Sequence, residues 1–354
     1  MAKVNKIHII GGGVAGLSAS YFARLHFPIA KIVVYEAGKK LGGRCQTFYS
    51  HKLGIEIDNA THVILGANTY AKNFWHDVSF IKKPTFCNVK QQNIDNKSFF
   101  HQDLLFRSVF NTAENDIAKL CKLNLAFKLF PYTPNKLQIC YSQHNLQQNL
   151  ITPLAQLGGE VKYNYLLREI KSENNQINKL IFSNDEIKLD DDEIVISALD
   201  SHNYRKIFGG NKFAYNRIVN IFYRTSQRIT LPNNANMLGV EGGIFDWLFV
   251  TENTIGVTIS NADKKLRCDE AFAVNIWKDI CKIRNVKPAF IPAFQILDYP
   301  RATISQDDKN NSLRPNNAKG KYKNLYIAGD WTMKNWPCCI EGAISSALRA
   351  IKTI

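Results

Sequence analysis

Residues 6–16 read KIHIIGGGVAG, in which a short apolar run leads directly into a cluster of glycines. The run predicts a buried strand, and the apolar spacing over residues 17–25 predicts a helix after the glycines. A second strand is expected over residues 31–35, and the acid Glu36 follows it. Strand, Gly-x-Gly-x-x-Gly, helix, strand and acid in this order are typical of a dinucleotide-binding unit. A glycine-rich turn in an unrelated α/β protein is the alternative interpretation.

Each glycine of this motif has a physical role in holding a pyrophosphate. Gly11 allows the tight turn, Gly13 lets the backbone approach the phosphates, and Gly16 lets the helix pack closely on the strand. The helix N-terminus offers free N–H groups to phosphate, and Glu36 can accept both hydroxyls of a ribose. Cofactor contacts are therefore expected from Gly11, Gly13, Val14, Ala15, Gly16, Glu36 and Ala37.

A second glycine pair decides which dinucleotide is bound. Residues 37–44 read AGKKLGGR, and a nicotinamide nucleotide does not need this second Gly-Gly-Arg. The segment resembles the extended FAD-binding signature of the amine oxidase and phytoene desaturase superfamily. In that superfamily the glycine pair passes over the pyrophosphate and the arginine steadies the phosphates, which implies these roles for Gly42, Gly43 and Arg44. An acid at position 36 also suits the unphosphorylated ribose of FAD.

A strand, loop and helix near the C-terminus form the second strong signal. Residues 324–330 read NLYIAGD, a buried-type strand that ends in Asp330, and a helix is expected over about 340–351. The superfamily closes its flavin site in this way, which implies that Asp330 accepts from ribityl hydroxyls near the pyrophosphate. The helix N-terminus would point at the flavin pyrimidine edge, where its partial positive charge stabilises the anionic reduced flavin. Expected contacts are Gly329, Asp330, Ile340, Glu341 and Gly342.

Further motifs resemble the hydroxysqualene dehydroxylase branch of this superfamily, also called squalene-associated FAD-dependent desaturase. Residues 57–67, IDNATHVILGA, resemble its Asp-Asn-Gly-Gln-His-hydrophobic-Gly-Ala motif. Residues 102–105 and 110–112 resemble its Glu-Pro-Leu and Leu-Asn-Thr-Pro segments. Residues 328–343 resemble its Ala-Gly-Asp-Trp-Thr and Ile-Glu-Gly-Ala end. The resemblance runs over most of the chain but is dense only at these places.

The branch implies a flavoenzyme that acts on an apolar isoprenoid, in which reduced FAD delivers hydride to an allylic carbon as a hydroxyl leaves. By the same resemblance Thr61 and His62 lie near the flavin, and the backbone of Leu167 meets the adenine. His62 could give or take a proton there, and a histidine that only fixes its loop is the alternative. Two other functions stay open: an oxidative desaturase or amine oxidase, and a flavin-binding partner without turnover in a lipid-synthesis complex.

The chain departs from the branch in three respects, one of which is Ser345-Ser346 in place of the usual Ser-Gly in the last helix. Ala60-Thr61 replaces Gly-Gln before His62, and the chain is short around residues 78–98, where relatives carry more of the substrate domain. Aromatic residues of the predicted substrate-domain sheet, among them Phe222 and Trp247, suit either a sheet core or the lining of an apolar substrate site. FAD binding is therefore more firmly implied than the substrate.

The expected fold is α/β, a Rossmann-like FAD-binding domain of the GR2 type with an inserted α+β substrate domain. A hairpin is predicted over residues 178–189 and a buried strand over residues 193–198. A helical pattern covers residues 116–128, and an amphipathic segment covers residues 141–157. The FAD-binding domain is expected to comprise residues 1–70, 134–205 and 306–354, and the substrate domain residues 71–133 and 206–305.

Composition limits the partners and the compartment. The 354 residues carry a net charge of +15, spread along the chain without zinc spacing or an Arg-rich tract, so neither metal nor nucleic acid is expected. Two interpretations of this charge stay open: lysines that are simply solvated, and a surface that docks on anionic lipid. The eight scattered cysteines indicate reduced thiols in the cytoplasm, and no apolar run is long enough to span a membrane. We expect a cytoplasmic protein in peripheral contact with the inner face of the membrane, and a reductant or an isoprenoid-pathway enzyme as partner.

Overall fold

The fold was analysed in a computed structural model. It describes residues 4–72, 87–88, 90–93, 98–99, 102–130, 138–141, 147–227, 229–232, 235–288 and 290–354. Most of the segment around residues 78–98, where the chain is short, lies outside the described residues, as do residues 142–146 of the predicted amphipathic segment.

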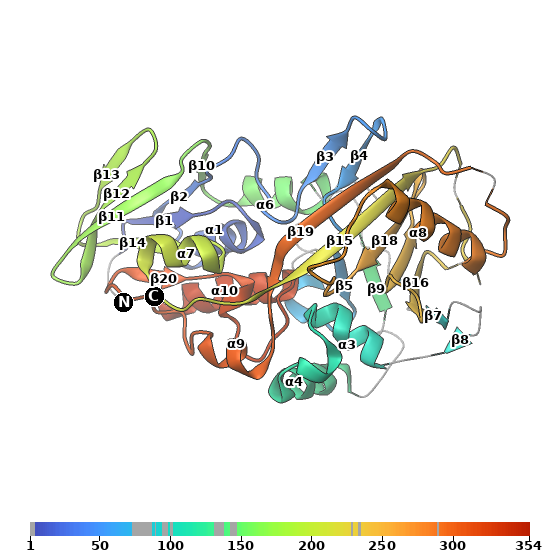
Figure 1. Ribbon diagram of the computed structural model, residues 1–354. Coiled ribbons are helices and arrows are strands. Elements are labelled where there is room, and N and C mark those ends of the chain that lie inside the picture. The colour runs from blue at the N-terminus through green and yellow to red at the C-terminus, as the bar shows by residue number, and fades with distance from the viewer. Residues whose placement is uncertain are drawn as a thin grey trace.

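One half of the molecule is built on a five-stranded parallel sheet with the strand order β10-β2-β1-β14-β20 (Figure 1). Its strands are β1 (Lys6–Ile10), β2 (Lys31–Tyr35), β10 (Glu160–Lys162), β14 (Glu193–Ser197) and β20 (Leu325–Ile327). The central strand β1 pairs in parallel with β2 on one side and with β14 on the other. Three stretches far apart in the sequence therefore meet in one sheet, and the predicted Rossmann-like α/β class is confirmed.

Both faces of this sheet are covered, as a parallel sheet requires. Because side chains alternate along a strand, Ile7 and Ile9 of β1 pack into one core with the helices, and Ile10 packs into another. The helices on the first face are α1 (Val14–His26), α6 (Thr152–Leu157) and α10 (Ile340–Thr353). The second face is covered by the antiparallel strands β11 (Leu167–Glu173), β12 (Gln176–Phe182) and β13 (Glu186–Lys188) and by α7 (Ser201–Phe208).

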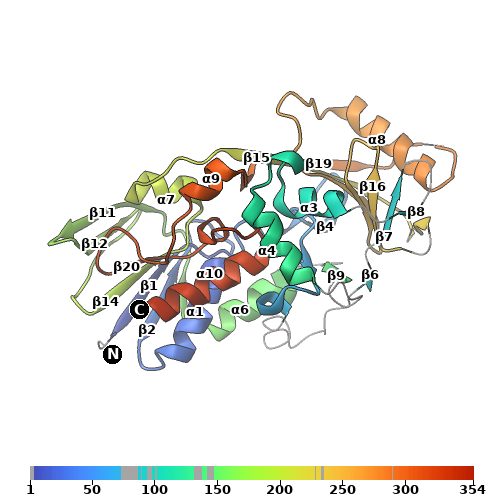
Figure 2. The ribbon, with the colours of Figure 1, turned by 90° about the horizontal axis from the view of Figure 1, so that it is seen from below.

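The other half contains a seven-stranded sheet with the order β19-β15-β18-β17-β16-β7-β8. Its strands are β7 (Lys90–Asn93), β8 (Ser98–Phe99), β15 (Tyr215–Arg224), β16 (Met237–Glu241), β17 (Trp247–Val250), β18 (Thr254–Ile259) and β19 (Phe294–Ile304). Helix α8 (Glu270–Ile283) packs on one face. Helices α3 (Gln102–Phe110) and α4 (Lys119–Leu129) pack on the other, as Figure 2 shows from below.

Short elements lie outside these two sheets. They are β3 (Thr47–Ser50), β4 (Ile55–Asp58), β5 (Val63–Leu65), β6 (Cys87–Asn88), β9 (Gln138–Tyr141), the 3₁₀ helices at Glu114–Asp116 and Asp330–Thr332, the π-helix at Gln147–Ile151 and α9 (Asp308–Leu313). Strand β9 pairs with β5 and β6, which lie on either side of the proposed boundary at residue 70. The domain boundaries stay predictions.

Most predicted elements are confirmed, with small shifts at their ends. The hairpin is β12 and β13, the buried strand is β14, and the last helix extends to Thr353. The helical pattern that begins at Asp116 is displaced, because a 3₁₀ turn ends at Asp116 and α4 starts only at Lys119. Within the described part of the chain, no helix is both long and apolar enough to cross a membrane.

Candidate cofactor and active site

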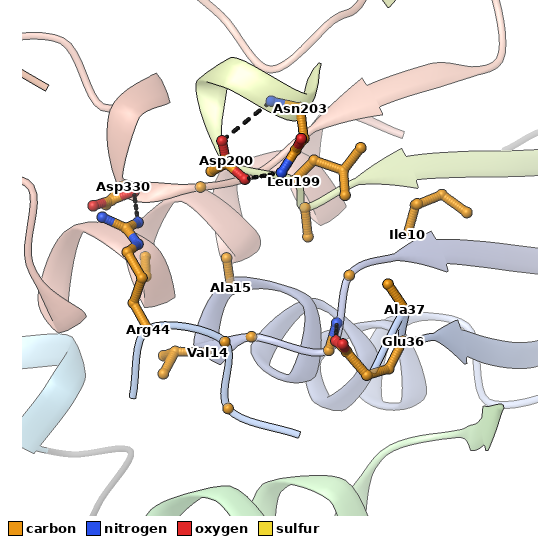
Figure 3. Close-up of a pocket in the computed structure, with 18 of the residues that line it drawn as sticks. Ile10, Val14, Ala15, Glu36, Ala37, Arg44, Leu199, Asp200, Asn203 and Asp330 are labelled. Atoms are coloured by element: carbon orange, nitrogen blue, oxygen red, sulfur yellow. Dashed lines mark hydrogen bonds and ion pairs between the residues drawn. The ribbon is translucent and has the colours of Figure 1, made fainter. Parts of the chain in front are cut away.

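A cavity of about 690 Å³ opens where the strands of the parallel sheet end (Figure 3). Residues that follow the carboxyl ends of β1, β2, β14 and β20 line it, which is where ligands bind in open α/β sheets. Among the residues predicted from the sequence, the cavity is lined by Gly11, Gly13, Val14, Ala15, Glu36, Ala37, Gly42, Gly43, Arg44, His62, Leu167, Gly329, Asp330 and Ile340. Residues separated by more than 300 positions are thus brought to one site.

The two glycine-rich loops lie against each other at this cavity. The N–H of Gly42 donates to the carbonyl oxygen of Gly12 over 2.8 Å, and Gly42 has a φ of +112°. A Cβ atom on Gly43 would lie 3.2 Å from the Cα of Gly13. A Cβ atom on Gly13 would meet nothing nearer than 3.9 Å. Gly13 is therefore open toward the cavity and leaves space in which a pyrophosphate fits.

Gly16 does not line the cavity, and its contribution is to packing. A Cβ atom at this position would lie 1.9 Å from the carbonyl oxygen of Gly11 and 3.2 Å from the Cβ of Ala198. No side chain fits at such distances unless the backbone moves. The structure therefore shows the close contact between α1 and the end of β1 that the motif predicts.

Glu36 is oriented by the backbone at the end of β2. One carboxylate oxygen accepts from the N–H of Gly12 at 2.9 Å, and the other accepts from the N–H of Gly38 at 2.7 Å. A carboxylate has about four acceptor positions, so each oxygen can accept a further hydrogen bond. The side chain lines the cavity and suits the two hydroxyls of an adenosine ribose.

Arg44 and Asp330 form an ion pair across the cavity (Figure 3). The Nη2–Oδ1 distance is 2.6 Å, and Nη1 of Arg44 also donates to the carbonyl oxygen of Ala302. Asp330 is buried, and its Oδ1 additionally accepts from the N–H of Trp331. The family resemblance implies contacts of both side chains with the cofactor, and the structure adds that they hold each other in place.

The N-terminus of α10 reaches the cavity through its N-cap residue Cys339 and through Ile340 and Ala343. Glu341 is buried, and its carboxylate accepts from the N–H groups of Tyr70 and Ala71 at 3.2 and 2.6 Å, so it is engaged with the start of another helical segment. Burial raises the pKa of Glu341. A Cβ atom on Gly342 would lie 2.8 Å from the carbonyl oxygen of Pro337. Glu341 and Gly342, both predicted as cofactor contacts, do not line the cavity in this structure.

His62 lies at the edge of the cavity in a closed set of hydrogen bonds. Its Nε2 is 3.0 Å from Oδ1 of Asn59, and its Nδ1 is 3.6 Å from Sγ of Cys45. The Asn59 amide is fixed, because its Oδ1 accepts from Gln46 N–H and its Nδ2 donates to the carbonyl oxygen of Arg44. Nε2 must therefore carry the hydrogen, and Nδ1 accepts from the thiol.

The charge state of this group agrees with that assignment. Burial lowers the pKa of His62, against the opposing effect of Asp58. Burial also raises the pKa of the Cys45 thiol to about 12, so it keeps its proton. His62 is thus a neutral imidazole with both nitrogens engaged, which is the arrangement expected of a histidine that fixes its loop. Its catalytic role stays a prediction.

Thr61 does not line the cavity either. The hydroxyl of Thr258, on β18, donates to Oδ1 of Asn220 at 2.8 Å, and the hydroxyls of Thr258 and Thr61 are 3.0 Å apart and hydrogen-bonded. Thr61 therefore connects the motif that carries His62 to the seven-stranded sheet. The aromatic residues Phe222 and Trp247, which suited either interpretation, are buried in the core formed with α3 and α4.

Several cavity residues were not predicted from the sequence. They are Ile10, Gly12, Tyr35, Cys45, Tyr165, Leu166, Arg168, Ala198, Leu199, Asp200, Asn203, Lys206, Ile207, Trp331, Cys338, Cys339 and Ala343. Asp200 caps α7 by accepting from the N–H groups of His202 and Asn203. An Asp-Ser pair just after a buried strand is a recognisable helix start, and this signal could have placed β14 and α7 at the site. No group of three or more His, Cys, Asp or Glu side chains among the described residues could hold a metal ion.

The cavity, the open Gly13 and the oriented Glu36 fit a dinucleotide whose adenosine ribose carries no phosphate. Together with the Rossmann-like sheet, they define an FAD-dependent oxidoreductase. The chain belongs to the flavin containing amine oxidoreductase family, whose sequence model matches residues 86–353. A model of the NAD(P)-binding Rossmann-like domain matches residues 9–78. The predicted cofactor, FAD, and the predicted superfamily are confirmed.

Related sequences and solved structures match nearly the whole chain. The chain is 26% identical to hydroxysqualene dehydroxylase of Sinorhizobium fredii and 27% identical to that of Zymomonas mobilis, each over 97% of both proteins. An oxidoreductase from Methanosarcina mazei superposes with a TM-score of 0.73 at 12% identity, covering 98% of this chain and 99% of that one. Cyclohexylamine oxidase from Brevibacterium oxydans gives 0.69 at 12% identity, covering 99% and 98%. At this identity the solved structures show the shared fold alone.

Proposed function

We propose that this enzyme removes the hydroxyl group of an apolar allylic alcohol of the isoprenoid class, with hydroxysqualene as substrate and squalene as product. The observation that carries the proposal is the match to hydroxysqualene dehydroxylases over 97% of both chains. The match is not confined to the nucleotide-binding motifs that all such flavoenzymes share. When bound, reduced FAD supplies the hydride that replaces the hydroxyl, which leaves with a proton as water.

The residues of this chain would hold and orient the cofactor. Glu36 would accept from the adenosine ribose, and the open backbone at Gly13 would receive the pyrophosphate. Asp330 and Arg44, already paired with each other, would fix the middle of the dinucleotide. The N-terminus of α10 at Ile340 presents a partial positive charge to the cavity and stabilises negative charge there. The neutral His62 would keep the loop at residues 59–62 against Cys45, and its supply of a proton to the leaving hydroxyl stays a prediction.

A single-turnover experiment tests this function. Enzyme reduced without oxygen is mixed with hydroxysqualene in detergent, and the lipids are analysed by mass spectrometry. We expect one squalene per FAD reoxidised, and none from a flavin-free Glu36→Ala variant. The second candidate is oxidation, as the family description indicates. If the reduced enzyme leaves hydroxysqualene unchanged while an amine reduces the oxidised enzyme, the dehydroxylase proposal is wrong.

The proposed substrate suggests where in the cell the protein acts and which partners it needs. A water-insoluble isoprenoid is held in a bilayer, so we propose that the protein is cytoplasmic and peripheral on the inner face of the membrane. Since each turnover would consume reduced FAD, a reductant must supply two electrons to the enzyme. An enzyme that makes the isoprenoid alcohol is the other partner we propose.

A further inference from the structure

Helix α4 (Lys119–Leu129) carries an apolar stripe on its solvent side. Leu120, Leu123 and Phe127 are 54%, 41% and 74% exposed, and Phe130, just after the helix, is 66% exposed. Their spacing of three, four and three residues places them on one face of a helix. Large exposed apolar side chains gathered in this way, rather than scattered singly, mark an interaction site.

This stripe is not needed to hold the helix in the fold. The opposite face of α4 presents Cys121, Leu125 and Leu129, which are all buried in the core shared with Phe222 of the seven-stranded sheet. The helix is therefore apolar on two faces, of which one is buried in this core and the other is largely exposed. Helix α4 lies at the lower edge of the molecule in Figure 1, and Figure 2 shows the molecule from that side.

Basic residues accompany the stripe. Lys119 and Lys122 lie on one side of it and Lys128 on the other, and residues 117–130 contain no acid. Asp116 and Glu114 precede the helix. An apolar face between lysines is the pattern of helices that lie in the plane of an anionic membrane surface. The net charge of +15 adds attraction over a longer range.

From this geometry we infer that α4 docks the protein on an anionic lipid bilayer, with Leu120, Leu123, Phe127 and Phe130 entering the interface and the lysines contacting lipid phosphates. A second copy of the chain fits less well. At about 200 Å² for a fully exposed side chain, the stripe offers on the order of 450 Å². One partner of a stable protein interface usually buries about 800 Å².

The docked helix is directly connected to the cofactor site. Asn124 of α4 donates to the carbonyl oxygen of Asn335 at 3.2 Å, and Nζ of Lys128 lies 5.8 Å from the ring centroid of Trp336. The same loop continues into Cys338 and Cys339, which line the cavity. Docking through α4 would hold this loop next to the bilayer, where an apolar substrate resides. This loading role rests on the proposed function, whereas the lipid contact does not.

Co-sedimentation of the FAD-loaded protein with vesicles tests the contact. We expect binding to vesicles containing phosphatidylglycerol at low salt, weaker binding at high salt, and little binding to phosphatidylcholine. Leu120→Ser with Phe127→Ser should lower the partition coefficient at least about tenfold, because two apolar side chains no longer enter the interface. Lys119→Gln with Lys122→Gln should lower it about fivefold per lysine on anionic vesicles only. Lys128 is left intact because of its contact with Trp336.

Matched variants elsewhere control for general changes in hydropathy and charge. Leu25→Ser with Ile29→Ser removes two side chains that are 59% and 86% exposed on α1 and the turn after it. Lys171→Gln with Lys188→Gln removes two exposed charges from the β11–β13 sheet. Both controls should bind vesicles as the wild type does. All variants should unfold close to the wild-type temperature, because no changed side chain is buried.

Each outcome bears on the inference. Unchanged binding of the Leu120→Ser, Phe127→Ser variant would overturn it, as would equal losses in the controls or no binding by the wild type. A wild-type dimer that this variant converts to a monomer would instead assign the stripe to a second copy. Turnover of detergent-solubilised hydroxysqualene should not change in the variants. If even the wild type fails in detergent, the proposed function is wrong while the vesicle result stands.

Discussion

Gly16→Ala should lower the stability of the fold, whereas Gly13→Ala should lower the affinity for FAD, although the two glycines are three residues apart in one motif. A Cβ atom on Gly16 would lie 1.9 Å from the carbonyl oxygen of Gly11, which is about half the distance between non-bonded atoms at their energy minimum. Relief requires the backbone of α1 or of the glycine loop to move. Overpacking of this kind costs about 1–3 kcal/mol and occasionally more, and we expect the upper end because backbone atoms clash.

Gly13 offers the contrasting case. Its φ of −77° and ψ of −179° are allowed for any residue, and the nearest atoms to a new Cβ are 3.9 Å away. The apoprotein should therefore change by less than about 1 kcal/mol, since the loss of backbone entropy in the unfolded chain offsets a poorer helix cap. The methyl group would occupy the space where the pyrophosphate is expected. FAD affinity should fall at least about tenfold, which corresponds to about 1.4 kcal/mol.

Two measurements separate the effects. Thermal unfolding of the apoproteins by circular dichroism should show Gly16→Ala several degrees below the wild type and Gly13→Ala within about 2 °C of it. FAD titration, followed by flavin fluorescence, should show the loss of affinity in Gly13→Ala. A Gly16→Ala protein with wild-type stability would refute the close packing of α1 on β1. Full FAD affinity in Gly13→Ala would refute the course we assign to the pyrophosphate.

Two further predictions concern the far end of the site and the central strand. Asp330→Ala should weaken FAD binding in the same titration although residue 330 is distant from Glu36 in sequence, and unchanged affinity would argue against assembly of the site from both chain ends. Burial lowers the pKa of His8, on β1, from 6.5 to about 4, so the unfolded chain takes up the proton first as the pH falls. The free energy of unfolding should therefore drop by about 3 kcal/mol between pH 6.5 and 4 in urea titrations. His8→Gln should remove that part of the pH dependence, and an identical pH profile in the variant would contradict the assignment.

The sequence predicts the parallel sheet well because its signals are local. A glycine motif between a strand and a helix fixes β1 and α1, and the run ending in Asp330 fixes β20 in the same way. Each needs only neighbouring residues to be recognised. The ends of elements are predicted less well, as at α4, where the helical pattern begins at Asp116, the last residue of a 3₁₀ turn, and the helix starts only at Lys119.

Contacts between distant parts of the chain could not be predicted in the same way. The pairing of Arg44 with Asp330 joins residues 286 positions apart, and motif knowledge assigns each of them to the cofactor separately. Glu341 belongs to the Ile-Glu-Gly-Ala segment that the resemblance places at the flavin. Its carboxylate nevertheless accepts from the backbone N–H of Ala71. Periodicity also shows that α4 has two apolar faces, but only the packing of the seven-stranded sheet decides which of them is buried.

The departure at Ala60-Thr61 shows how a change in a motif is accommodated by a contact outside it. Thr61 takes the place of a longer glutamine in the related motif, and its hydroxyl is hydrogen-bonded to that of Thr258 on β18. The next residue, His62, is bonded to Asn59 within its own loop and to Cys45 beside the cavity. The loop is thereby held from both halves of the molecule at once, between the sheet that would bear the substrate and the site that binds FAD. The sequence alone shows only that the glutamine of the related motif is missing. In the fold, the threonine that replaces it forms a polar contact between the two halves.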